Sequence, residues 1–337
     1  EYQSIMLVWF PLGRAHRRNS VAPLFLLLGM IVLLPQSAGS TDANNFVTIQ
    51  ASHTKSTLMS IQFRTHQNGW VVGTGGTILN TTDGGKKWKR QTSGTSTLLT
   101  SVFFADSSTG WVTGAGGFLS RTTNGGESWL SQHLDTQQAL YGVYFTSPRI
   151  GWVVGGGGTI LHTTDGGQHW AEQASGTTAT LYAAHFLNDQ QGTIVGALGT
   201  VLSTDDGGVT WTSQETQHAV TLFDVFFTDS TTGWVVGNAG ALFQTTDRGA
   251  KWVDLTLPCG TTCTRLTDLL KVRFTSPQEG WIVGERGMLY RTTDAGLTWS
   301  EGKSIASSSL FGLSFPDAMH GWASGENGSI VHLQPGR

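Results

Sequence analysis

A segment of 41 residues recurs along the chain, and this repeat constrains the fold more than any other feature. Its marker is a Gly-Trp pair, found at Gly69-Trp70, Gly110-Trp111, Gly151-Trp152, Gly233-Trp234, Gly280-Trp281 and Gly321-Trp322, with Gly192-Thr193 where one more would fall. The steps are 41, 41, 41, 41, 47 and 41 residues, so the chain contains seven units. A period in the forties with several short β segments per unit is typical of propeller blades.

Each unit contains four β segments separated by turn residues. The second unit shows the order: LTSVFF (99–104), GWVTG (110–114), a third segment that ends in the turn TTNGGESW, and a fourth that starts at Trp129. Apolar alternation bounded by Gly, Asp, Ser and Thr predicts four antiparallel strands per unit. The expected blades cover residues 58–92, 99–133, 140–174, 181–215, 222–256, 269–303, and 310–333 together with 46–50.

The last unit is incomplete, because it has only SIVHL (329–333) after its Gly-Trp segment. The missing fourth strand is present at the other end of the chain, where VTIQ (47–50) matches the register of WKRQ (88–91) and WTSQ (211–214). We therefore predict an all-β, seven-bladed β-propeller whose last blade is closed by the N-terminal strand. This closure leaves no blade with a missing strand and an unpaired edge.

The start of the chain has the pattern of an export signal. A basic stretch, an apolar run and small residues follow one another: Arg14, Arg17 and Arg18; VAPLFLLLGMIVLL (21–34); Ser37, Ala38 and Gly39. This order predicts a signal peptide over 1–39, with a linker over 40–45 before the propeller at 46–337. A retained N-terminal membrane anchor is the alternative, although the run is shorter than the roughly 20 residues of a membrane span. The chain opens on Glu1 and not on Met, which is consistent with a misplaced start.

The expected mature chain has a small negative net charge. Without residues 1–39 it has 20 − 3 = 17 positive and 23 − 1 = 22 negative residues, a net charge of 17 − 22 = −5. This charge argues against a general nucleic-acid-binding surface.

Cys259 and Cys263 are the only two cysteines. In an exported protein they are expected to form a short-loop disulfide. A lone CxxxC without a neighbouring histidine does not predict a metal site.

Six turns of the type TTDGGxxW end the third segment of the units. An aspartate can accept hydrogen bonds from backbone N–H groups of its own turn, and the following tryptophan buries its ring against the sheet. Calcium ligation or acid catalysis is the alternative, but six equivalent copies cannot form one active site, and one copy has Asn in place of Asp. We assign a structural role to Asp83, Asn124, Asp165, Asp206, Asp247, Asp294, Trp88, Trp129, Trp170, Trp211, Trp252 and Trp299.

This turn is that of the BNR or Asp-box repeat, which sialidases, xyloglucan hydrolases and sorting receptors also contain. Combined with GWxVGxxGxIL at this period over residues 46–333, it resembles the photosystem II stability and assembly factor family of plants and cyanobacteria. The resemblance implies a seven-bladed propeller, exported to the periplasm or thylakoid lumen, that binds a membrane-protein precursor and has no catalytic activity. That family is associated with an arginine-rich patch, and the scattered arginines of this chain do not align with it one by one.

A partner-binding surface is expected where the repeats differ from one another. The loop between the second and third segments carries charge only in the last two units, and the one insertion is LPCGTTCTRLTD (257–268). One position of the first segment is small in five units but is Asp224 and Lys271 in two adjacent units. These two charges are expected to contribute to partner binding, and the alternative is that they form an ion pair with a structural role only. The candidate partner-binding residues are Asp224, Arg265, Lys271, Glu285, Arg286 and Glu326, and, more weakly, Arg121 and Arg291.

Enzyme chemistry is not expected. A sialidase needs an arginine triad and a Tyr nucleophile, and other glycosidases need two carboxylates across the bond. Neither set stands out, and metal-binding or nucleotide-binding motifs are absent from the sequence. We predict a non-catalytic, exported, monomeric scaffold in the periplasm, thylakoid lumen or extracellular space, with a protein partner and no cofactor, metal or nucleic acid. The alternatives are an Asp-box glycoside hydrolase, sialidase-like or xyloglucanase-like, and a general envelope protein-interaction propeller in a non-photosynthetic bacterium.

Overall fold

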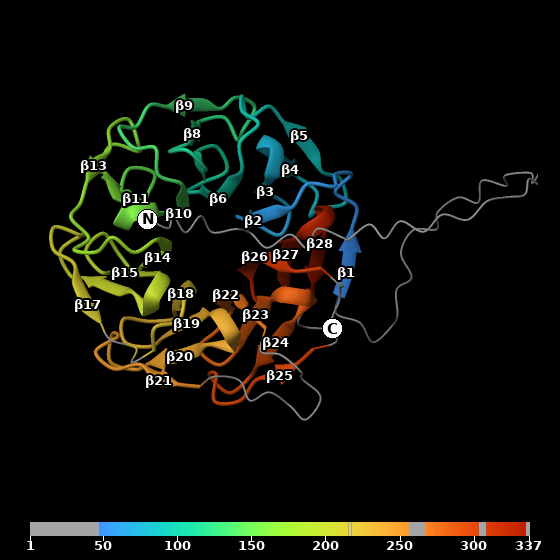
Figure 1. Cartoon of the computed structure of the whole chain (residues 1–337). Helices are drawn as coiled ribbons and strands as arrows, with labels where there is room; N and C mark the ends of the chain where they lie inside the picture. Colours follow the sequence, from blue (N-terminus) through green and yellow to red (C-terminus); the bar gives the residue numbers. More distant parts are fainter. Residues whose placement is uncertain (1–46, 215, 217, 256–266, 303–307, 335–337) are drawn as a thin grey trace, which may run out of the picture. The chain divides into compact units, whose positions relative to one another are not determined.

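Seven four-stranded antiparallel sheets surround a common centre in the computed structural model (Figure 1). The structure describes residues 47–214, 216, 218–255, 267–302 and 308–334. The predicted signal peptide (1–39) and linker (40–45) lie outside these residues. Neighbouring sheets contact each other through their first strands, and the contacts run all the way around from the first sheet to the last. The predicted seven-bladed β-propeller with four antiparallel strands per blade is therefore confirmed.

Each of the first six blades takes its strands consecutively from the chain. Blade 1 contains β2 (Leu58–Phe63), β3 (Gly69–Gly73), β4 (Thr77–Thr81) and β5 (Lys89–Gln91). Blade 2 contains β6 (Leu99–Phe104), β7 (Gly110–Gly114), β8 (Leu119–Thr122) and β9 (Leu130–Gln132). Blade 3 contains β10 (Leu140–Phe145), β11 (Gly151–Gly155), β12 (Ile160–Thr163) and β13 (Ala171–Glu172).

The remaining blades follow the same order, except for the last. Blade 4 contains β14 (Leu181–Phe186), β15 (Gly192–Gly196), β16 (Val201–Thr204) and β17 (Thr212–Gln214). Blade 5 contains β18 (Leu222–Phe227), β19 (Gly233–Gly237), β20 (Leu242–Thr245) and β21 (Val253–Asp254). Blade 6 contains β22 (Leu269–Phe274), β23 (Gly280–Gly284), β24 (Leu289–Thr292) and β25 (Ser300–Glu301). Blade 7 contains β26 (Leu310–Asp317), β27 (His320–Gly325), β28 (Ile330–Leu333) and β1 (Val47–Gln50).

The N-terminal strand β1 closes the ring, as the sequence predicts. It pairs antiparallel with β28, in a register that sets Val47 opposite Leu333 and Gln50 opposite Ile330 (Figure 1, where blue β1 lies beside red β28). The Gln50 amide Nε2 then donates to the Gly84 carbonyl of blade 1 at 2.8 Å. The closing strand therefore completes the sheet of the last blade and bonds to the first blade through a side chain.

The core consists of apolar layers between adjacent blades. Five of the seven first strands bury a Leu, a Val or Ile and a Phe, as Leu222, Val225 and Phe227 do in β18. In β14 the middle position is Ala184, in β26 it is Leu313, and the tryptophan of each Gly-Trp pair is also buried. In five blades the phenylalanine stacks closely on the tryptophan of the preceding blade, as Phe104 does on Trp70 with 3.6 Å between ring centroids. After a register shift that follows the first residue of each first strand, alternation sends every second side chain into these layers.

The Asp turns are held by their own hydrogen bonds. In blade 1, Thr81 Oγ1 donates to Asp83 Oδ1 at 2.9 Å, and the same carboxylate oxygen accepts from the Lys87 N–H at 2.9 Å. The Asn124 side-chain oxygen makes both contacts in blade 2, from Thr122 Oγ1 at 2.8 Å and the Ser128 N–H at 3.0 Å. An amide oxygen therefore replaces the carboxylate in this turn, and the bonds need no negative charge.

No helix within the described ranges is long and apolar enough to cross a membrane.

Candidate functional site

The centre of the ring holds a cavity of about 400 Å³, lined by the first strand of every blade. In β18, Leu222, Val225 and Phe227 point between blades, and a register shift after Leu222 turns Asp224 and Phe226 toward the centre. The same shift occurs in each first strand, so the third and fifth residues of all seven strands line the cavity. Each blade thus contributes the same two positions to one site.

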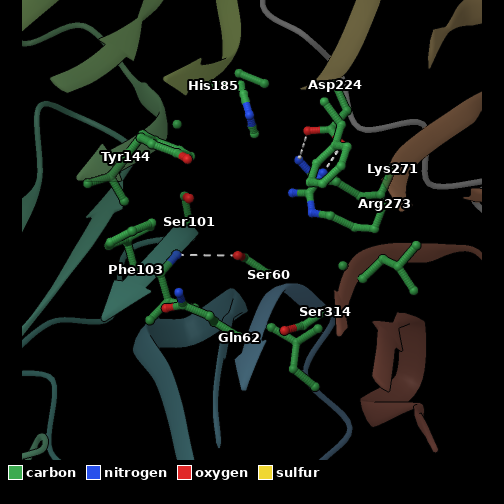
Figure 2. A pocket seen from close by; sticks show the side chains of 18 of the residues that line it. Ser60, Gln62, Ser101, Phe103, Tyr144, His185, Asp224, Lys271, Arg273 and Ser314 are labelled. Atoms are coloured by element: carbon green, nitrogen blue, oxygen red, sulfur yellow. Dashed lines mark hydrogen bonds and ion pairs between the residues drawn. The ribbon is translucent and has the colours of Figure 1, made fainter. Parts of the chain in front are cut away.

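Charge gathers on one side of this cavity (Figure 2). Asp224 Oδ1 lies 3.1 Å from Lys271 Nζ, and Asp224 Oδ2 lies 2.6 Å from an Arg273 guanidinium nitrogen. The Val272 N–H also donates to Asp224 Oδ2 at 3.0 Å. The carboxylate is almost fully buried, whereas the two cations are about a quarter exposed. We call these three side chains, Asp224, Lys271 and Arg273, the charged triad.

Two titratable groups in the cavity have shifted pKa values. Burial alone would raise the pKa of the Asp224 carboxyl, but Arg273, Lys271 and the Val272 N–H together hold it below its ordinary value. Burial, with a smaller contribution from Arg273, lowers the pKa of His185 to about 3. At neutral pH the cavity therefore carries an ionised aspartate, two cations and a neutral imidazole.

Aromatic rings cover the wall beside the charged triad. The centroids of Phe103 and Tyr144 lie 5.4 Å apart, those of Tyr144 and His185 5.3 Å, and those of His185 and Phe226 5.1 Å. The Arg273 guanidinium lies 5.6 Å from the Phe226 ring centroid. The Tyr144 hydroxyl donates to the Phe186 carbonyl at 2.9 Å, and burial raises the pKa of this phenol.

Hydroxyl and amide side chains from β26 and β2 line the wall on the other side of the charged triad from the aromatic rings (Figure 2). Ser60 Oγ accepts from the Val102 N–H of the next blade at 3.3 Å, and Ser314 Oγ accepts from the Phe63 N–H at 2.9 Å. Gln62 Oε1 accepts from the Phe104 N–H. Asp224 accepts from Val272 in the way that Ser60 accepts from Val102, so it serves the same inter-blade bond and adds a charge.

The structure brings only some of the predicted surface residues together. Asp224 and Lys271 meet in the cavity. Glu285 Oε2 and Glu326 Oε2 instead accept from backbone N–H groups at the start of their own blades, from Asp268 at 3.4 Å and Ser309 at 3.1 Å. These two glutamates hold local loops. Arg265 and the predicted disulfide partners Cys259 and Cys263 lie outside the described residues.

The remaining predicted arginines do not line the cavity that contains Asp224 and Lys271. Arg286 is in the short turn η5 (Glu285–Gly287), with a left-handed φ of 56°. Arg291 forms an ion pair with Glu279 at 2.7 Å, and its guanidinium lies 5.0 Å from the Trp281 ring centroid. Arg121 lies in the same way over Trp111, at 6.0 Å. Arg121 and Arg291 are the penultimate residues of the third strands β8 and β24, next to the Asp turns.

Sequence reasoning missed Arg273, His185 and Tyr144 as cavity residues. A signal was available for Arg273, because it follows Lys271 by two residues and side chains two apart share one face of a strand. Within the described part of the chain, no group of three or more His, Cys, Asp or Glu side chains could hold a metal ion.

Comparisons of the chain with known proteins identify its family. A family model described as photosynthesis system II assembly factor YCF48 matches residues 39–137, 127–212, 172–257 and 213–304. A comparison with curated proteins gives no match.

Solved structures of similar fold include one described as YCF48 bound to D1 peptide, with 22% identity, a TM-score of 0.73, and 86% of this chain and 97% of that chain covered. YCF48 from Cyanidioschyzon merolae has 22% identity and a TM-score of 0.72, with 86% and 98% covered. The GH74 xyloglucanase from Xanthomonas campestris has 12% identity and a TM-score of 0.70, with 86% and 54% covered. At these identities the likeness is one of fold alone.

Proposed function

The chain belongs to the photosynthesis system II assembly factor YCF48 family, and we propose that it is a non-catalytic scaffold that binds a membrane-protein precursor or complex. The observation that carries the proposal is the family match, which extends over residues 39–304 and so includes six of the seven blades. One solved YCF48 structure is described as bound to D1 peptide. For this chain we infer a partner of the same kind, a polypeptide segment of a membrane protein.

The central cavity is the proposed contact site for a polar group of that segment. Lys271 and Arg273 supply two positive charges against the single carboxylate of Asp224, and both cations keep part of their surface in contact with solvent. An excess of positive charge in a concave site favours an acidic group. Of the surface predicted from sequence, Glu285, Arg286 and Glu326 extend the proposed contact onto the loops between the second and third strands of blades 6 and 7.

Export is part of the proposal. The basic stretch, the apolar run and the small residues before residue 40 support a signal peptide, with a retained anchor as the alternative. The mature scaffold would then lie in the periplasm, thylakoid lumen or extracellular space, where membrane-protein segments emerge on the far side of the bilayer.

The structure supports a scaffold over an Asp-box glycosidase. Glycoside hydrolysis normally needs two carboxylates placed across the scissile bond. Among the described residues that line the cavity, Asp224 is the one carboxylate, and it is already bound by two cations and a backbone N–H. The GH74 xyloglucanase shares the fold at 12% identity, which gives no argument for shared chemistry.

A crosslinking pull-down from the native host tests the proposal. We expect recovery of a membrane-protein precursor or complex by the wild-type chain, and at least tenfold weaker recovery by D224A/K271S/R273Q. That variant removes the charged triad and keeps residue types found at the same positions in other blades. The control variant K86S/K87Q removes two exposed lysines from an Asp turn. Recovery of an unrelated envelope complex would favour the general envelope scaffold, and turnover of a glycoside panel would refute the non-catalytic role.

A further inference from the structure

Blade 4 lacks the tryptophan that the other six blades place between neighbouring sheets, because Thr193 follows Gly192. In five blades the indole stacks on the phenylalanine of the next blade with 3.5 to 3.8 Å between ring centroids, and in the sixth the centroids lie 5.7 Å apart. These pairs are Trp70–Phe104, Trp111–Phe145, Trp152–Phe186, Trp234–Phe274, Trp322–Phe63 and Trp281–Phe315. Phe227 is the phenylalanine that has no such partner.

The second face of the indole is also covered in several blades. His162 lies 4.8 Å from Trp152 and His332 lies 4.5 Å from Trp322, measured between ring centroids. Arg121 and Arg291 cover their tryptophans in the same way. The equivalent residue of blade 4 is Ser203, which pairs with Thr193 across β15 and β16. Blade 4 thus has small side chains both at the indole position and at the position that covers it.

A cavity of about 220 Å³ remains where the indole would lie, with Thr193, Ser203, Leu187, Gln214, Phe227 and Arg248 in its wall. We call it the blade 4–5 slot. Instead of a stacked indole at 3.5 to 3.8 Å, the ring of Phe227 has His185 at 6.1 Å and Trp252, in a T-shaped arrangement, at 6.2 Å between centroids. An apolar cavity of roughly 150 Å³ is enough to bind benzene. The blade 4–5 slot therefore has room for a larger aromatic ring.

The slot also keeps a polar partner for an indole. In blades 1, 2 and 3 the tryptophan Nε1–H donates to the carbonyl after the turn Asp or Asn of the next blade, at 3.0 to 3.2 Å. The corresponding carbonyl beside blade 4 belongs to Arg248, which lines the slot. Gln214 does not turn toward it but donates to Ser203 Oγ within its own blade, at 2.9 Å. By contrast, Gln173 donates to the Gly207 carbonyl of the next blade.

We propose that the blade 4–5 slot binds a tryptophan side chain of a partner polypeptide. The inference rests on the proposed protein-binding function and adds a specific anchor to it. The incoming ring lies flat on Phe227 and directs its N–H toward the Arg248 carbonyl, as the chain's own indoles do in blades 1 to 3. Exposed Asp205 and Asp247 at the rim, against the single cation Arg248, favour a lysine or arginine next to that tryptophan.

A fluorine-labelled probe tests this site without any knowledge of the partner. N-acetyl-5-fluorotryptophan amide is titrated with the purified chain, and broadening of its ¹⁹F NMR line reports binding. Unlabelled N-acetylleucine amide is added as a non-aromatic control for displacement of the probe. The variant T193W restores the residue of the other blades and fills the slot, whereas T193V keeps the slot open. We expect wild type and T193V to bind the probe within about twofold of each other, with T193W at least about tenfold weaker, a difference of about 1.4 kcal/mol. Leucine amide should not displace the probe.

Two results would overturn the slot: no broadening with wild type at millimolar probe, or equal broadening with wild type and T193W. If T193W does not fold, S203H, which brings the covering residue of blades 3 and 7, carries the same comparison. Probe binding by a chain that captures no membrane protein would refute the proposed function and leave the slot. Capture of a membrane protein without probe binding would refute the slot alone.

Discussion

Replacement of Asp224 by alanine is expected to destabilise the propeller, because it leaves two cations facing each other without a counter-charge. Asp224 is 2% exposed, and its carboxylate accepts from Lys271 at 3.1 Å, Arg273 at 2.6 Å and the Val272 N–H at 3.0 Å. Removal of one member of a buried ion pair costs about 3 to 5 kcal/mol. Lys271 and Arg273 are 23% and 28% exposed, so water screens part of their repulsion. We therefore expect a loss of about 3 kcal/mol in the free energy of unfolding, at the lower end of that range.

Equilibrium urea denaturation measures this loss, and a matched variant isolates its cause. D224A/K271S/R273Q replaces the charged triad by residues that other blades carry at the same positions, as in Ala183, Ser60 and Gln62. Replacement of a whole buried ion cluster is often close to neutral, because the cost of desolvating the charges disappears together with their attraction. The triple variant should therefore recover most of the stability that D224A loses.

The reasoning predicts an order of stability: wild type and the triple variant above D224A. A D224A protein within about 1 kcal/mol of wild type would show that the carboxylate is not held by buried charge pairs, since exposed pairs contribute 0 to 1 kcal/mol. A triple variant less stable than D224A would show that the cations contribute by packing and not by pairing with Asp224.

Three further changes test other parts of the ring. The pKa of His185 is about 3 in the folded protein, against 6.5 in the unfolded chain. Between these pH values the unfolded chain binds more protons, so the free energy of unfolding falls as the pH drops below 6.5, by about 2 kcal/mol at pH 5. H185F should flatten this part of a stability profile measured from pH 7 to pH 5, and an unchanged slope would contradict the assignment. Q50A removes the bond from the closing strand to blade 1 and should cost about 1 kcal/mol in urea denaturation, more than Q214A, whose amide bonds only within blade 4. D206N should melt within a few degrees of wild type with or without EDTA, because Asn124 already makes the same turn bonds in blade 2. D206A, which loses these bonds, should melt at a lower temperature than D206N. A melting temperature of the wild type that falls in EDTA would instead support a calcium site.

The sequence determined the frame of the molecule because the frame is repeated. Six Gly-Trp pairs, six Asp turns and seven apolar first strands are each local patterns. A pattern that recurs at a nearly fixed step has one economical arrangement in space. The closure by Val47–Gln50 was also predictable, since the strand absent from the last unit stands at the other end in the matching register.

The candidate site was only half predictable. Asp224 and Lys271 were visible as deviations from a small residue, and their spacing of one blade predicted that they would be neighbours. Arg273 was overlooked, because its position varies in every blade and no deviation marks it. Glu285 and Glu326 deviated as clearly, yet they bind loops of their own blades, since a long side chain can turn back on local N–H groups.

Only the tertiary structure decided whether the space of the missing tryptophan in blade 4 is filled or left open. The sequence shows Thr193 in place of a tryptophan, but it cannot say whether a neighbouring side chain fills the space. That depends on contacts between blades 41 residues apart, where Ser203 is small, Gln214 turns back, and Phe227 keeps its place. If the neighbouring sheets moved together, the same substitution would leave no cavity. Here the surrounding blades hold their positions, and the missing indole leaves a slot.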